Sequence, residues 1–171
     1  ERDGLSQYES VSSVKVSGFE GEVSYQYKDD LRVLVNCSYQ DARDMNRYKD
    51  DGKPSITYNN KLPNRPWLFS NVEADYIFRD VLKNGDKLKL SYHYQYVHWF
   101  YLTWEAYGSL DGKSKIPTQH QHNAVVSYSW KNERYNVSFG CNNLFDKELY
   151  DNFMLQKPGR SFFAKFRIFI N

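Results

Sequence analysis

The sequence has 171 residues, of which 40% are hydrophobic and 18% aromatic, and a formal net charge of +2 at pH 7. Its mean hydropathy of -0.78 is that of a hydrophilic chain, yet it contains 15 Tyr and 11 Phe. No stretch approaches the roughly 18 consecutive apolar residues that a membrane-spanning helix needs, and the weak net charge does not indicate nucleic-acid binding. The composition favours β-sheets that have one wetted face.

The sequence begins Glu1-Arg2-Asp3-Gly4, without an initiator Met or a signal peptide. We therefore expect either a processed protein or part of a longer one. Cys37 and Cys141 lie far apart and outside any metal-binding spacing. We expect them to be free packing residues and not a disulfide, because lone thiols behave as small apolar side chains.

Taken in order, the chain alternates between apolar and polar residues in separate segments, as β-strands with one buried face do. The last segment is typical: Phe162, Ala164 and Phe166 fall on one face, and Ser161 and Lys165 on the other. The alternating segments predict about seven strands, near residues 10-28, 31-42, 66-82, 86-103, 119-130, 134-142 and 160-170.

The connections between these segments alternate between turns of about 2-4 residues and polar loops of about 15-20 residues. Outer-membrane barrels have such connections, short on the periplasmic side and long outside. The pattern predicts an all-β fold, an antiparallel meander that forms part of a transmembrane outer-membrane β-barrel.

Aromatic residues fall near both ends of the expected strands, where membrane barrels carry aromatic girdles. The outer group is Trp67, Trp99, Phe100, Tyr101 and Trp104, and the inner group is Tyr25, Tyr27, Phe78, Tyr128 and Trp130. A soluble antiparallel sandwich or lipocalin-like barrel also alternates, but its loops would seldom sort so cleanly by length. A small standalone outer-membrane barrel, acting as an adhesin or structural protein, is the other alternative.

Three sequence elements carry a family resemblance. They are Ser17-Gly18-Phe19-Glu20-Gly21-Glu22, Leu62-Pro63-Asn64-Arg65-Pro66, and Asn142-Asn143-Leu144-Phe145-Asp146-Lys147-Glu148-Leu149-Tyr150 before the strand that starts Pro158-Gly159-Arg160. In this order and at these places, they resemble the barrel of TonB-dependent outer-membrane receptors. The resemblance covers essentially residues 1-171, as the C-terminal segment of such a barrel.

The resemblance implies a barrel of about 22 strands around an N-terminal plug. It implies active uptake of a scarce ligand, such as an iron-siderophore, haem or cobalamin, across the bacterial outer membrane. The implied partners are outer-membrane lipid, the chain's own N-terminal barrel and plug, TonB through that missing part, and a small-molecule ligand. The family usually ends on an aromatic residue, whereas Ile170-Asn171 follow Phe169 here.

About seven strands cannot close a barrel of this size, so the first and last strands would leave open edges. We expect the isolated segment either to self-associate through these edges or to wrap into a smaller closed form. No nucleophile elbow, phosphate-binding loop or Cys-His constellation occurs in the sequence. We therefore predict no enzyme activity and no cofactor.

Ligand contact is predicted in the outer loops, where aromatic and polar side chains gather. The candidates are Arg47, Tyr48, Trp99, Tyr101, Trp104 and Tyr107, although the same aromatic residues could instead anchor the membrane interface.

Histidines and carboxylates offer weaker candidates. His120 and His122 share a strand face and could bind a metal, but no third ligand lies near them in the sequence. His93 and His98 could contact a haem-like ligand. We favour the interpretation that they are ordinary polar residues of the barrel wall and rim. The carboxylates are expected to be solvated residues that line the barrel interior, namely Glu20, Glu22, Glu73 and Asp75.

Overall fold

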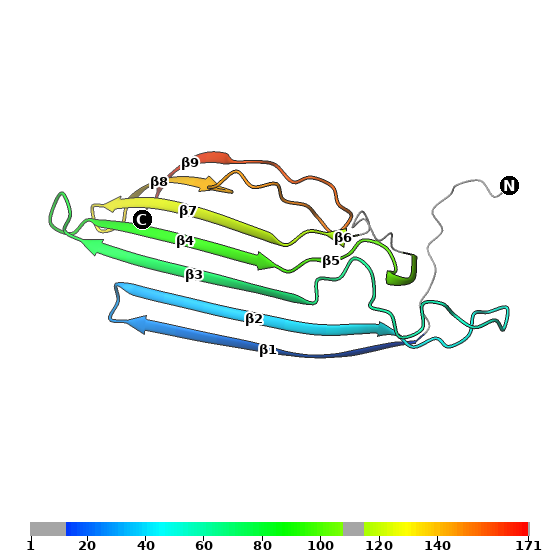
Figure 1. The fold of residues 1–171 in the computed structure, drawn as a ribbon. Helices are drawn as coiled ribbons and strands as arrows, with labels where there is room; N and C mark the ends of the chain where they lie inside the picture. Colours follow the sequence, from blue (N-terminus) through cyan, green and yellow to red (C-terminus); the bar gives the residue numbers. More distant parts are fainter. Residues whose placement is uncertain (1–12, 108–114, 171) are drawn as a thin grey trace.

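The computed structural model describes residues 13-107 and 115-170. The first residues of the expected strand 10-28, the opening Glu1-Gly4 and the terminal Asn171 lie outside this part. Seven antiparallel strands form one sheet in the order β1-β2-β3-β4-β7-β8-β9 (Figure 1). They are β1 (Val14–Tyr27), β2 (Leu31–Asp44), β3 (Leu68–Arg79), β4 (Lys87–Val97), β7 (Gln119–Trp130), β8 (Tyr135–Asn142) and β9 (Ser161–Ile168). The predicted all-β antiparallel meander is confirmed.

Two smaller elements lie between β4 and β7. Strands β5 (Phe100–Tyr101) and β6 (Lys115–Ile116) form a separate two-stranded sheet, and η1 (Glu105–Tyr107) is one turn of 3-10 helix. Apart from β5 and β6, the strands pair in the order in which they follow one another in the chain.

The register divides the sheet into an apolar face and a polar face. Val35 on β2 pairs with Val23 on β1 and Val72 on β3, and Val72 pairs in turn with Tyr94 on β4. One residue along, Asn36 pairs with Asn71, which pairs with Gln95. Because paired residues point to the same side of a sheet, each face keeps its character across the strands.

The apolar face has no second layer over it in the described part of the chain. Phe19, Val23, Phe162 and Phe166 are 59% to 69% exposed. The buried hydrophobic residues of that same part are few: Ala42, Phe100, Ile116, Cys141 and Leu149. A soluble sandwich would bury such a face against another sheet. Among the described residues, no helix is both long enough and apolar enough to cross a bilayer.

The connections sort by length onto the two ends of the sheet, as Figure 1 shows. Residues 28-30, 80-86 and 131-134 make the short turns at one end, which we name the turn end. Residues 45-67, 98-118 and 143-160 make the long connections at the opposite end, which we name the loop end; of the second connection, the structure describes residues 98-107 and 115-118.

The 80-86 turn is organised around Asp86, which is 2% exposed. Its carboxylate accepts hydrogen bonds from the backbone N–H groups of Val81, Leu82 and Lys83 at 2.8, 3.0 and 2.9 Å and from the Tyr128 hydroxyl at 2.5 Å. Burial opposes ionisation of Asp86, but these hydrogen bonds hold its pKa below the usual value. The turn is thereby fastened to β7.

Two expectations about the loop end were wrong. The strand expected over 86-103 ends at Val97, because Phe100 and Tyr101 leave the main sheet and pair with β6. Phe100 was expected in an aromatic girdle, but it is 1% exposed and Ile116, its partner, is 0% exposed. This pair forms a small apolar core beneath the loops. At the turn end, the strand expected over 66-82 ends at Arg79, since Asp80 turns the chain with a φ of 56°.

Both cysteines are free thiols. Cys37 pairs with Gly21 and Cys141 pairs with Phe162, which places both on the apolar face. Cys37 is half-buried and Cys141 is 6% exposed.

Candidate functional site

The loop end is held together at Asn64. Its backbone N–H donates to the Tyr101 carbonyl oxygen at 2.7 Å. With the amide nitrogen turned toward them, its side chain donates to the carbonyl oxygens of Leu102 and Asn152 at 2.8 and 2.9 Å. Asn64 has a φ of 57°, a left-handed conformation that Asn adopts more readily than most residues. One residue of the Leu-Pro-Asn-Arg-Pro element thus connects the three long connections.

Aromatic rings and cations gather beside this junction. The ring centroids of Trp99 and Tyr101 are 5.4 Å apart, and those of Trp67 and Trp99 are 6.2 Å apart. The Lys115 ammonium lies 4.6 Å from the Trp99 ring centroid, and the Lys61 ammonium lies 4.3 Å from that of Trp67. Cations over aromatic faces at these distances form favourable cation–π contacts. We name Lys61, Trp67, Trp99, Tyr101 and Lys115 the rim cluster.

Two titratable side chains near the rim cluster have shifted pKa values. Burial lowers the pKa of His98, and the charge of Lys61 lowers it further. Burial raises the pKa of Tyr101, and its hydroxyl also donates a hydrogen bond to the Glu105 carboxylate at 3.1 Å. Both side chains are therefore neutral near pH 7, and the positive charge of the rim cluster comes from its two lysines.

Arg47 and Tyr48 lie in the 45-67 connection, which extends beyond the other loops in Figure 1. The Arg47 guanidinium donates to the Tyr58 hydroxyl at 3.2 Å and lies 5.4 Å from its ring centroid. Tyr48 forms an isolated β-bridge with Pro54 and is 67% exposed. Arg47 is thus engaged within its own loop, while Tyr48 presents its ring to the outside.

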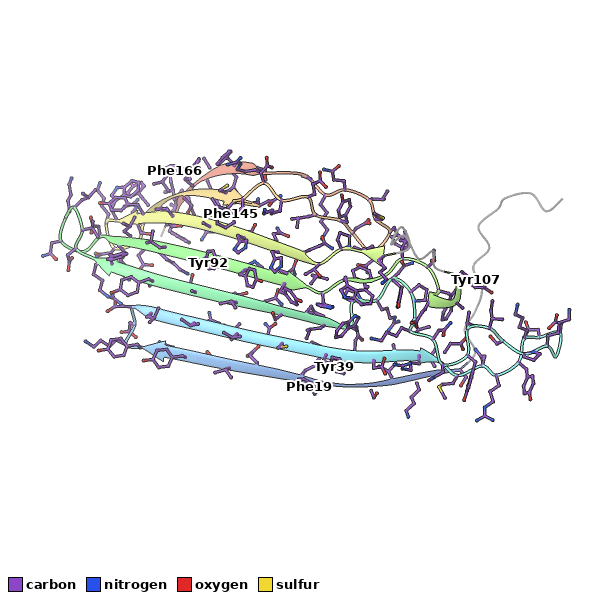
Figure 2. All side chains as sticks on the ribbon, in the orientation of Figure 1. Phe19, Tyr39, Tyr92, Tyr107, Phe145 and Phe166 are labelled. Carbon is purple, nitrogen blue, oxygen red and sulfur yellow. The ribbon has the colours of Figure 1, made fainter. Side chains whose placement is uncertain are left out.

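Trp104 and Tyr107 belong to the segment around η1. The Tyr107 backbone N–H donates to the Trp104 carbonyl oxygen at 2.9 Å, and Tyr107 is 57% exposed. Figure 2 shows Tyr107 at the loop end, away from the main sheet. The following residues, 108-114, lie outside the described part of the chain.

Of the six predicted contact residues, the structure thus brings Trp99 and Tyr101 into contact with each other. Arg47 and Tyr48 form a second group on another loop, and Trp104 and Tyr107 a third near η1. Sequence reasoning did not single out Lys61 or Lys115, because a surface lysine carries no distinguishing pattern. It did single out the element that contains Asn64, but not the hydrogen bonds that this residue makes.

The polar face forms a continuous wall of hydrogen-bonded side chains. Asn71 donates to Asn36 at 2.9 Å, Ser38 donates to Glu20 at 2.9 Å, and Ser91 donates to Asp75 at 2.6 Å. Glu22 and Glu73 also lie on this face, as the register with Asn36 and His93 shows. These partners are the interstrand contacts expected of a wetted wall.

The histidines divide between the two faces. His93 lies on the polar face, with its Nδ1 3.3 Å from the Asn123 amide nitrogen. His120 and His122 lie on the apolar face, paired with Tyr96 and Tyr94. Within residues 13-107 and 115-170, no group of three or more His, Cys, Asp or Glu side chains is placed to hold a metal ion.

A single-layered sheet with an apolar outer face, a polar inner wall and long connections at one end is a section of a transmembrane β-barrel. The family model described as "TonB dependent receptor-like, beta-barrel" matches residues 1-144. The chain therefore belongs to the TonB-dependent receptor β-barrel family, whose barrels lie in the outer membrane of Gram-negative bacteria.

Among solved structures, the crystal structure of BauA, the ferric preacinetobactin receptor from Acinetobacter baumannii, has a similar fold. The TM-score is 0.68 at 17% sequence identity, over 88% of this chain. The chain spans 21% of the length of that receptor. No curated protein matches the sequence.

Proposed function

We propose that this segment is the C-terminal part of the barrel wall of a TonB-dependent receptor, which takes up a scarce ligand such as an iron-siderophore, haem or cobalamin. The observation that carries the proposal is the two-faced, single-layered sheet, with its three long connections together at one end. The family match supports it, and the similarity to a siderophore receptor favours the siderophore among these ligands.

In this proposal the loop end faces the outside of the cell, and the rim cluster and Tyr48 contribute to the ligand-binding surface. Aromatic faces combined with lysine ammonium groups suit a ligand that carries both rings and negative charge. The polar face lines the barrel interior toward a plug, and the open edges of β1 and β9 pair with other strands of the same receptor. An isolated segment would expose both edges and self-associate.

The segment's own role is binding and passage, without catalysis. Energy would come from TonB, acting on a part of the receptor outside residues 1-171.

The orientation can be tested with epitope tags in the full-length receptor. A tag after Gly52, in the 45-67 connection, should bind antibody on intact cells, and a tag after Gly85, in the 80-86 turn, should bind only after the outer membrane is permeabilised. Both glycines have positive φ, 76° and 83°, and lie in exposed turns, so the two insertions are matched. The opposite labelling pattern would refute the proposed orientation.

Transport can be tested by uptake of radiolabelled ferric siderophores, haem and cobalamin in cells with and without TonB. TonB-dependent uptake of one of them identifies the ligand class. Uptake of none, by a receptor that is correctly folded and displayed, would contradict the transport function.

A further inference from the structure

A band of rings crosses the apolar face near the loop end. It begins with Phe19 on β1 and Tyr39 on β2, passes through Trp67 and His98, and reaches His122 on β7 and Phe145 in the following connection. Neighbouring ring centroids along it are 4.4 to 6.1 Å apart. Phe19, Tyr39 and Phe145 are labelled in Figure 2. We name this row of rings the ring band.

The position of the ring band suits the outer membrane boundary. His120 and Trp130 are ten residues apart on β7, which corresponds to about 33 Å along a strand and about 25 Å in height at a strand tilt near 40°. A second aromatic group, with Trp130 stacked between Tyr128 and Tyr135, occupies the turn end of the same face. The two groups are thus separated by the height of the apolar band of an outer-membrane barrel, about 25 Å.

The centre of the ring band contains three tyrosine–histidine pairs. The hydroxyl of Tyr92 lies 2.6 Å from Nδ1 of His122, that of Tyr94 lies 2.8 Å from Nδ1 of His120, and that of Tyr96 lies 2.5 Å from Nδ1 of His98. A membrane-facing girdle needs aromatic rings but no imidazoles, and polar groups at this depth cost free energy unless they have partners. The pairing gives each hydroxyl and each Nδ1 a partner, but the second ring nitrogen of each imidazole is left to be accounted for.

The pairing fixes the chemistry that the imidazoles present. We assign the tyrosine hydroxyl as the donor in each pair, because a phenol is a stronger acid than a neutral imidazole N–H, and this assignment leaves the imidazole proton on Nε2. Among the described residues, none of the three Nε2 atoms has a hydrogen-bond partner. The ring band thus holds three N–H donors ready for an acceptor from outside the chain.

A shallow, open hollow of about 330 Å³ is lined by the histidines of two of these pairs, His120 and His122, together with Val72, Tyr92 and Tyr94. Lys61 lies over Trp67 at the same end of the sheet, and Lys115 lies over Trp99. No carboxylate in the described part of the chain is within 4.0 Å of either ammonium group. The hollow is therefore lined by apolar and aromatic side chains and two imidazoles, and the two lysines lie at the same end of the sheet.

We propose that the tyrosine–histidine pairs of the ring band bind the phosphate group of an anionic glycolipid in the outer leaflet, with the acyl chains against the apolar face below. The proposal rests on the proposed function, which places the loop end at the outer boundary. Imidazole N–H donors and lysine ammonium groups complement a phosphate oxygen, and tyrosine rings complement the sugar and the upper acyl chain. A neutral lipid would leave the imidazole N–H donors without an acceptor.

The test uses the full-length receptor, purified in detergent and incubated with a bisphosphorylated diglucosamine lipid or with the same lipid after removal of its phosphates. Native mass spectrometry counts the lipid molecules retained. We expect the phosphorylated form to bind at least about tenfold more tightly, since one hydrogen bond to a charged group corresponds to that factor or more. Equal retention of both forms would overturn the proposal.

Variants locate the site. The double variant His120→Phe/His122→Phe keeps two rings but removes both donors, and it should lose about tenfold or more in affinity for the phosphorylated lipid. His120→Gln/His122→Gln restores an N–H near the position of Nε2 and should recover binding. His93→Phe, on the polar face, is the matched control and should bind like the unmodified receptor. Loss of binding in the His93 variant, or none in the His120/His122 variant, would overturn the assignment.

Two further arms separate the alternatives. If the receptor retains phosphatidylglycerol more tightly than the diglucosamine lipid, the partner is a glycerophospholipid and not a glycolipid, and the proposal is overturned. Binding of Zn²⁺ alone that disappears in the His120/His122 variants, without a change in lipid binding, would make the cluster a metal site instead. Failure of the proposed function has a different signature, because an unmodified receptor would then take up no ligand whether or not it retained lipid.

Discussion

Gly18 on β1 is the position where the sheet tolerates a side chain least. A Cβ added there would overlap the backbone carbonyl oxygen of Tyr39 and lie 3.0 Å from Cα of Gln40. Both obstacles are backbone atoms of the paired strand, so no change of rotamer can relieve the overlap. On the same strand, a Cβ added at Gly21 meets no atom within 4 Å. The two glycines therefore form a matched pair.

We expect Gly18→Ala to destabilise the barrel by about 3 kcal/mol, the upper part of the range for overpacking, since the strands must move apart. Gly21→Ala should instead stabilise it by about 0.5 to 1 kcal/mol, because alanine loses less backbone entropy on folding. The difference between the two variants exceeds about 3 kcal/mol, which corresponds to more than a hundredfold change in the ratio of folded to unfolded receptor.

The assay is urea unfolding of the full-length receptor in detergent micelles, followed by the gel mobility of the folded barrel. A loss of 3 kcal/mol lowers the urea midpoint by about 1 M or more for ordinary denaturant dependences. Gly140→Ala is a useful intermediate, because its Cβ would meet the ring of Phe163, which can rotate away. Equal midpoints for Gly18→Ala and Gly21→Ala would refute the reasoning, since they would show that β1 and β2 separate at no cost.

Three further predictions follow from the loop end, the turn end and the apolar face. Asn64→Ala should weaken ligand binding by the full-length receptor about tenfold, because it removes the bonds to Leu102 and Asn152. Asn59 has the same left-handed backbone as Asn64 but no side-chain hydrogen bond among the described residues, so Asn59→Ala should leave ligand binding unchanged. Equal losses of affinity in the two variants would show that backbone strain alone is responsible. The folded-state pKa of Asp86 is lowered, so its contribution to stability is present above pH 3.8, the value of a free carboxyl, and is lost as the pH falls through the lower folded value. Asp86→Asn should abolish that part of the acid-dependent loss in a pH series of urea midpoints, and an unchanged pH profile would contradict it. A lipid-soluble maleimide should modify Cys37 in membranes faster than a water-soluble one does, while the buried Cys141 resists both, and the reverse order would place the apolar face toward water.

The strand pattern and the polarity of the two faces could be predicted from the sequence. Alternation with a period of two is a local property, so the sequence of each strand by itself shows which of its faces is apolar. Glu20 and Phe19, or Lys165 and Phe166, separate onto opposite faces whatever the strands pair with. The short turns are also local, because residues such as Asn84 and Gly85 favour tight turns through their own backbone preferences.

The loop end was less predictable because its contacts join residues that are far apart in the sequence. Phe100 continues the alternation of β4, so periodicity placed it in a longer strand, but pairing with Ile116 removed it from the sheet and buried it. The predicted contact residues fell into three groups for the same reason. Local composition shows that a loop is aromatic, but not which loops meet.

The sequence by itself determined the class of protein, because a barrel wall is specified by short-range alternation and by the lengths of its connections. Only the tertiary structure decided where the chemistry lies. Cross-strand pairing placed His120 and His122 beside the tyrosines of β4, on the face away from the polar wall. Loop docking placed the Asn64 side chain within hydrogen-bonding distance of Leu102 and Asn152 in two other loops. Such contacts depend on strand register and loop docking. Both are set by the whole sheet, so no periodic pattern within a single segment predicts them.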